Sequence, residues 1–166
     1  MRIVFDSNVL IAAHIARGLA NTVYEHCLKQ HEIVVSHIIL GELETGLLKK
    51  AEMPPDRVAL ILAAIERIAT GGEIAEVSPK VCRDPQDLHV LGLAAKSKAD
   101  LINTGDIDLL EIGIFQGIPI ETPRRFWERE CEERKRCSGR GQQEKPRTVH
   151  ERRESVYKTA QKKRRS

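Results

Sequence analysis

Short apolar strands alternate with helical segments along most of this chain. Residues 2–5, 32–36 and 101–102 are runs of aliphatic and β-branched side chains, and residues 74–77 and 118–120 are weaker runs of the same kind. Between these runs, apolar residues recur at helical spacing over residues 9–16, 19–30, 37–50, 58–69 and 86–98. The alternation predicts an α/β fold with a parallel sheet of four to five strands, flanked by helices on both faces.

Length and composition limit the class of protein further. A chain of 166 residues has room for one α/β domain and a tail. Aromatic residues make up only 4% of it, so the core must be aliphatic. No run of about 18 apolar residues is present, which excludes a spanning helix, and an acid at position 6 is not typical of a secretory signal. We therefore expect a cytoplasmic protein without a membrane segment.

Charge is distributed unevenly along the sequence. Residues 134–166 contain thirteen basic and three acidic residues, a net charge of +10, whereas residues 1–133 carry a net charge of −7. From about residue 138 the sequence also loses its apolar periodicity. We expect an α/β domain over residues 1–137 and a basic tail over residues 138–166 that is disordered in isolation.

Acidic residues follow the predicted strands. Asp6 comes directly after the first strand, and Asp106 comes shortly after the strand at residues 101–102. Asp87 lies in the first turn of the helix that precedes this later strand, and Glu42 lies in the helix after the second strand. Ligands of parallel sheets bind beyond the carboxyl ends of the strands, so these side chains could share a cleft. Each acid taken alone also fits a common structural role, as a helix cap, a first-turn acid or an exposed residue.

Four segments together resemble the motifs of PIN-domain ribonucleases, in the same order and spacing over residues 2–127. The first is the apolar strand that runs into Asp6, Ser7 and Asn8, and the second is the aliphatic frame around Glu42. The third is Asp84-Pro85-Gln86-Asp87, and the fourth is Asn103-Thr104-Gly105-Asp106-Ile107-Asp108. The resemblance is greatest to the VapC-like toxins of toxin–antitoxin systems, and it implies a PIN-like fold.

The resemblance also implies roles for particular residues. The metal ligands and catalytic acids would be Asp6, Glu42, Asp87 and Asp106, with Asp108 as a fifth candidate ligand and Asn8 and Thr104 as supporting polar residues. Asp84 is better explained as a helix cap. Glu44 competes with Glu42 but points about 200° away on the same helix. Asn103 is a polar residue where the strand of the family's fourth motif is usually apolar, which predicts that the end of this strand is less buried.

Ligands that are all carboxylates favour Mg²⁺ or Mn²⁺ over zinc. The four cysteines form no CxxC pair, and none of the six histidines belongs to a recognisable Ser/His or Cys/His motif. A metal-activated water would therefore be the nucleophile in hydrolysis of RNA phosphodiester bonds. The basic tail, including Lys162, Lys163, Arg164 and Arg165, is a candidate arm for RNA phosphates, although a solvated tail or a contact with an antitoxin explains its charge as well.

The leading hypothesis is a divalent-metal-dependent endoribonuclease that acts as the toxin of a toxin–antitoxin pair, with RNA as substrate and an antitoxin protein as partner. Two alternatives remain open: a PIN nuclease of RNA processing that has no antitoxin, and a catalytically inactive PIN scaffold that binds RNA or protein. Homodimers are common in the resembled family, so self-association is a further expectation.

Overall fold

A computed structural model describes residues 1–139, and within them a six-stranded sheet forms the centre of the unit Met1–Arg129. The strand order is β3-β2-β1-β4-β6-β5, and all neighbours are parallel except β5 and β6. The strands are β1 (Arg2–Phe5), β2 (Glu32–Val35), β3 (Thr70–Gly71), β4 (Leu101–Asn103), β5 (Ile114–Phe115) and β6 (Ile118–Glu121).

The described residues also form seven α-helices between and after these strands, and a short 3₁₀ turn at Pro85–Asp87 precedes the fifth. The α/β fold class expected from the sequence is confirmed. The sheet has six strands where four or five were expected, and the sequence did not predict β3 and β5 because each has only two residues. The helices are α1 (Ser7–Ile15), α2 (Leu19–Gln30), α3 (His37–Lys49), α4 (Pro55–Ile68), α5 (Leu88–Ser97), α6 (Ile107–Ile112) and α7 (Pro123–Gly139).

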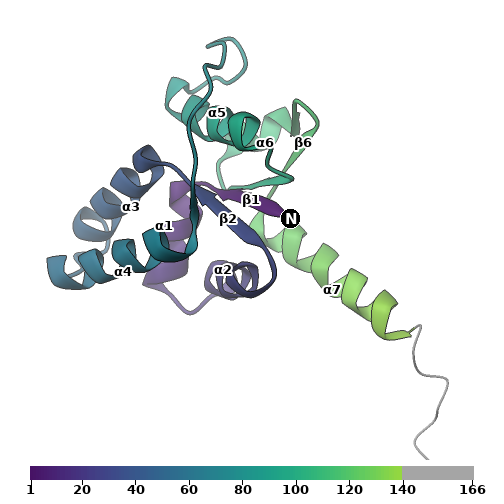
Figure 1. Cartoon of the computed structure of the whole chain (residues 1–166), viewed down its shortest axis with the longest axis horizontal. Coiled ribbons are helices and arrows are strands. Elements are labelled where there is room, and N and C mark those ends of the chain that lie inside the picture. The colour runs from purple at the N-terminus through teal and green to yellow at the C-terminus, as the bar shows by residue number, and fades with distance from the viewer. Residues whose placement is uncertain (140–166) are drawn as a thin grey trace, which may run out of the picture. The chain divides into compact units, whose positions relative to one another are not determined.

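Helices cover both faces of the sheet, as expected (Figure 1). Phe5 of β1 makes an edge-to-face ring contact with Tyr24 of α2 on one face. Val4 and its partner Val34 point to the opposite face, where α5 lies, since Val34 and Leu93 both approach Gly72. The side chains of Phe5, Tyr24, Val4, Val34 and Leu93 are all buried, so the core extends over both faces of the sheet.

The weak strand predicted at residues 74–77 is wrong, because this segment is an irregular loop. Its backbone pairs with a helix instead of a strand: the amide of Ala75 donates to the carbonyl oxygen of Gly92 in α5 at 3.1 Å. A Cβ atom on Gly92 would lie 2.2 Å from the carbonyl oxygen of Ala75. The absent side chain at Gly92 is therefore what lets the loop lie against α5.

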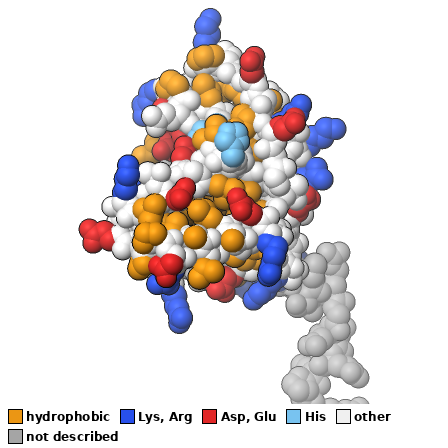
Figure 2. Space-filling model, turned by 60° about the vertical axis from the view of Figure 1, so that its left-hand side comes forward, with side chains coloured by type: hydrophobic (Ala, Val, Ile, Leu, Met, Phe, Trp, Pro, Cys, Tyr) orange, Lys and Arg blue, Asp and Glu red, His pale blue; other side chains and the backbone are white. Residues whose placement is uncertain are grey.

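Figure 2 shows one face of the molecule, on which hydrophobic side chains gather between acidic ones and Lys and Arg lie mostly around the margin. No helix within the described residues is long and apolar enough to cross a membrane. A second compact unit begins at Glu130, so the domain boundary expected at residues 137 and 138 stays a prediction. The expected disorder of the tail and the contacts of its basic residues fall on residues 140–166, outside the described part.

Gly92→Ala should destabilise the protein by about 1–3 kcal/mol, because a methyl group there collides with a backbone oxygen that cannot rotate away. Gly41→Ala is the matched control: Gly41 lies inside α3 with nothing within 4 Å of a Cβ, so alanine should stabilise the helix by about 0.5–1 kcal/mol. Denaturant unfolding of both variants measures the difference. Equal stability changes would contradict the close contact.

Candidate functional site

The strand order reverses between β1 and β4, and the candidate site lies at that point. The chain moves outward from β1 through β2 to β3, then returns to form β4 on the other side of β1. The loops that leave the carboxyl ends of β1 and β4 must therefore diverge, which opens a crevice at the sheet edge. Asp6 follows β1 directly, and Asp106 follows β4 after two residues.

Thr104 connects these two loops. Its hydroxyl group donates to Asp6 Oδ2 at 2.9 Å and accepts from the backbone amide of Asp106 at 2.9 Å. Both Thr104 and Asp6 are buried. The Asp6 side chain occupies the N-cap position of α1 yet makes no capping hydrogen bond, and it interacts with the Thr104 and Ser7 hydroxyl groups instead. Capping by the side chain therefore does not explain Asp6.

Three carboxylates come close together beside this connection. One oxygen from each of Asp87, Asp106 and Asp108 lies within 4.8 Å of the others, an arrangement that could hold a metal ion. Asp106 also accepts a hydrogen bond from the amide of Asp108 at 2.8 Å, which caps α6. Asp108 is paired with the exposed guanidinium of Arg83, whose Nε lies 3.3 Å from Oδ2.

The electrostatic consequence is largest at Asp87. Burial, together with the charges of Asp106, Asp6 and Asp84, raises the pKa of Asp87 to about 6 from its usual 3.8. The thiol of the buried Cys82 lies 3.8 Å from Asp87 Oδ2 and lowers that pKa in part. Ionising Asp87 is thus costly in the absence of a compensating cation.

These donors fit a hard divalent cation. All three side chains in the cluster offer carboxylate oxygen atoms, which is the ligand type that Mg²⁺ and Mn²⁺ prefer. Burial first, and the neighbouring carboxylates second, raise the pKa of Asp87, so a bound cation would offset the cost of its ionised form. The identity and number of the ions stay predictions.

Glu42 lies on α3 across the cleft from the aspartate cluster. Its Oε2 lies 3.4 Å from Nε2 of His89, a residue of α5. Glu44, the competing acid on the same helix, is exposed and is not among the residues that line the cleft. The structure therefore puts Glu42, and not Glu44, on the side of α3 that could reach a bound metal.

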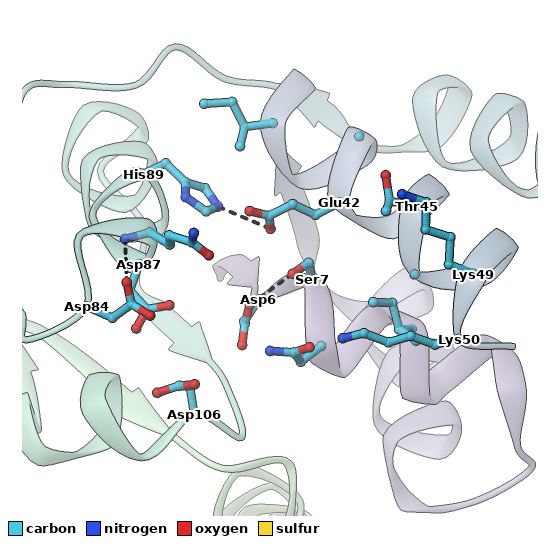
Figure 3. A pocket seen from close by; sticks show the side chains of 16 residues that line it. Asp6, Ser7, Glu42, Thr45, Lys49, Lys50, Asp84, Asp87, His89 and Asp106 are labelled. Carbon is cyan, nitrogen blue, oxygen red and sulfur yellow. Dashed lines mark hydrogen bonds and ion pairs between the residues drawn. The ribbon is translucent and has the colours of Figure 1, made fainter.

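Most of the predicted site residues line one cleft, which has a volume of about 560 Å³ (Figure 3). The described residues that line it include the four predicted acids and Asn8, whereas Thr104 lies beneath Asp6 and Asp108 lies outside the lining. Asp84 also lines the cleft, and its side chain accepts a hydrogen bond from the amide of Gln86 at 2.8 Å, consistent with the cap expected from the sequence.

Sequence reasoning missed several residues of this site. His89 and Arg83 contact acids 47 and 25 positions away in the sequence, so no local spacing could indicate these pairs. Lys49 and Lys50 also line the cleft. Lysines are common in the last turn and at the C-cap of a helix, where these two lie, so the sequence did not mark them as site residues. Asn103 was expected near a less buried strand end, and this is wrong because its side chain is fully buried.

Comparisons with known proteins agree with this fold. The PIN domain family model matches residues 2–108, so the chain belongs to the PIN domain family. VapBC2 from Rickettsia felis, solved bound to a DNA fragment from their promoter, has a chain with 16% identity and a TM-score of 0.51, covering 74% of this chain and 98% of its own.

Two further solved structures are similar. VapBC-1 from nontypeable Haemophilus influenzae has 12% identity and a TM-score of 0.51, covering 75% of this chain and 99% of its own. FitAcB from Neisseria gonorrhoeae has 12% identity and a TM-score of 0.45, covering 73% of this chain and 97% of its own. No curated protein matches the sequence.

Thr104→Val should destabilise the protein by about 1–3 kcal/mol, since it removes the acceptor of the Asp106 amide and the donor to Oδ2 of the buried Asp6. Thr104→Ser keeps the hydroxyl group and should retain most of the stability. Unfolding midpoints in EDTA measure both effects. If serine is as destabilising as valine, the hydrogen bonds of the hydroxyl group do not account for the loss.

The pKa of Asp87 predicts a pH dependence for the metal-free protein. Because the pKa of the folded state lies above that of the unfolded state, the contribution of Asp87 to stability is complete below about pH 4 and is lost as the pH rises through about 6. Asp87→Asn should therefore gain thermal stability relative to the wild type between pH 4 and pH 7, where each kcal/mol corresponds to about 2–4 °C.

Thermal midpoints of both proteins in EDTA, measured across this pH range, test the prediction. Adding Mg²⁺ at pH 7 should raise the midpoint of the wild type more than that of Asp87→Asn. A constant difference between the two proteins at every pH would contradict the shifted pKa.

Proposed function

We propose that this chain is a divalent-metal-dependent endoribonuclease. The observation that carries the proposal is the cluster of Asp87, Asp106 and Asp108 at the strand-order reversal of a PIN domain. The buried Asp6 lies at the same edge of the sheet. PIN domains are typically nucleases. A recessed set of carboxylates, in which burial and neighbouring charges raise the pKa of Asp87, is more useful for holding a cation than for stabilising the fold.

The proposed roles follow from the contacts of each residue. Asp6, Asp87 and Asp106 would hold the ion, with Glu42 reaching it from the opposite wall and Asp108 available when Arg83 releases it. A bound Mg²⁺ or Mn²⁺ would supply an activated water and would offset negative charge on the phosphodiester. Thr104 keeps the Asp6 carboxylate oriented, and Ser7 supports it from 3.4 Å.

The remaining polar groups in the cleft support metal-dependent hydrolysis over a side-chain nucleophile. The Ser7 hydroxyl group donates to Asp6, and Nε2 of His89 faces Glu42. Among the described residues, no contact joins a serine or cysteine to a histidine in the cleft that could activate it. The proposed reaction is hydrolysis by water, with a carboxylate-bound cation as the activating group.

We further propose that the cognate partner is an antitoxin protein, which would make the chain the toxin of a toxin–antitoxin pair. Support comes from the sequence resemblance to VapC-like toxins and from structural similarity to chains of VapBC2 and VapBC-1. A processing nuclease without an antitoxin would share the same site. A gene for a small antitoxin next to the gene for this chain would distinguish the two.

Cleavage of a labelled single-stranded RNA panel tests the proposed activity. The full chain should cleave with Mg²⁺ or Mn²⁺ and lose activity in EDTA, and Asp6→Asn should reduce the rate by at least about 100-fold, because it removes a proposed ligand. Glu42→Gln should also lower the rate. Glu44→Gln is its matched control on the same helix, outside the cleft, and should retain activity.

Two results would contradict the proposal. Metal-independent cleavage that survives in Asp6→Asn would exclude the carboxylate site as the source of activity. A folded wild-type protein that binds RNA with Mg²⁺ but cleaves no member of the panel would favour the scaffold alternative.

A further inference from the structure

The cleft has two ends of opposite charge. Asp84, Asp87 and Asp106 lie at one end, and Lys49 and Lys50 lie at the other (Figure 3). Among the described residues that line the cleft, Lys49 and Lys50 are the two lysines, and no arginine lines it. The lysines contribute nothing to the proposed metal site, so their place in the cleft needs a separate explanation.

The α3 helix links the two ends. Glu42, Thr45 and Lys49 are separated by three and four residues, so they lie on one side of the helix and all line the cleft. At 1.5 Å per residue, Lys49 is about 10 Å farther along the axis than Glu42. This length exceeds the spacing of neighbouring phosphates along one strand of a helix, about 3.4 Å of axis, so the lysines would meet a different phosphate from the one at the acidic end.

Both lysines are available to a ligand. They are exposed, and no ion pair joins either of them to another of the described residues. The Lys50 side chain extends toward the middle of the cleft (Figure 3). Arg83, by contrast, is already engaged with Asp108.

We propose that Lys49 and Lys50 form a phosphate-binding subsite for single-stranded RNA, which holds the backbone at a phosphate other than the one at the acidic end. This inference rests on the proposed ribonuclease function. A single strand fits better than a duplex, because Asp6 is only 3% exposed, and a strand must bend to bring one phosphate down to it while its neighbours contact the lysines. No aromatic side chain is among the described lining residues, so the subsite recognises the backbone and not the bases.

The simpler explanation is that lysines at the end of α3 stabilise the helix dipole. The chain offers a matched control for this explanation. Lys29 and Lys96 are exposed last-turn residues of α2 and α5, and they lie outside the cleft. Lys29→Ala/Lys96→Ala removes the same number of charges from helix C-terminal ends as Lys49→Ala/Lys50→Ala, in which Lys49 is a last-turn residue and Lys50 is the C-cap. Lys96 also gives up an exposed ion pair with Glu73.

The test measures binding of the full chain to fluorescent single-stranded RNA by anisotropy, with Mg²⁺ present and with Asp106→Asn in every protein to prevent cleavage. Asparagine can still cap α6 at this position. Lys49→Ala/Lys50→Ala should weaken binding by about tenfold at low salt. It should also reduce the slope of log affinity against log salt by about 1.4, because two phosphate contacts are lost. The effect should be similar for RNAs of different sequence, and the Lys29/Lys96 variant should bind like its parent.

Several results would overturn the subsite. These are an unchanged affinity, an equal loss in the Lys29/Lys96 control, an equal loss for duplex RNA, or equal competition by polyglutamate, which would indicate an acidic peptide ligand. Thermal midpoints check that both double variants fold. Wild-type cleavage assays separate the two proposals: RNA binding that depends on the lysines without cleavage sinks only the nuclease, and cleavage with an unchanged KM in the Lys49/Lys50 variant sinks only the subsite.

Discussion

The parallel pairing of β1 with β4 is the constraint on which the site depends. Phe5 and Asn103 are register partners, and the amide of Asp6 donates to the carbonyl oxygen of Asn103 at 3.0 Å. This pairing places Asp6 beside Thr104, whose hydroxyl group then connects it to the amide of Asp106. Two acids a hundred positions apart in the sequence are thereby fixed at one edge of the sheet. A register shift of one residue would turn these side chains to the opposite face.

The same pairing explains why the acids are costly and why they remain in place. Burial in the fold, together with neighbouring carboxylates, raises the pKa of Asp87, so the ionised form of Asp87 opposes folding in the absence of a cation. The surrounding aliphatic core contributes the stability that offsets this cost, and it encloses β1 and β4 on both faces. Functional sites commonly tolerate local instability of this kind because the rest of the structure fixes their geometry.

The sequence could predict whatever depends on strand ends and periodicity. The α/β fold and the positions of Asp6 and Asp106 after neighbouring strands follow from such local patterns. Contacts set by tertiary packing could not be predicted: the pairing of Glu42 with His89 requires α3 and α5 to meet across the cleft. The loop at residues 74–77 was mistaken for a strand because its apolar residues pack on α5, where Gly92 leaves room for its backbone.

The α3 helix determines what the cleft can bind as well as where it lies. Ser36 caps the start of the helix by accepting from the amide of Ile39 at 3.3 Å, and near its end Gly46 meets Ile11 of α1 so closely that a Cβ would lie 2.3 Å from the isoleucine Cδ1. The helix thus starts directly after β2, the partner strand of β1, and its far half packs against α1, which follows Asp6. One rigid element therefore carries Glu42 toward the carboxylates and the lysines away from them. In the proposed binding cleft, the acidic and basic ends are joined by a helix and not by a mobile loop, so the spacing between a metal-bound phosphate and its neighbours would be set before RNA binds.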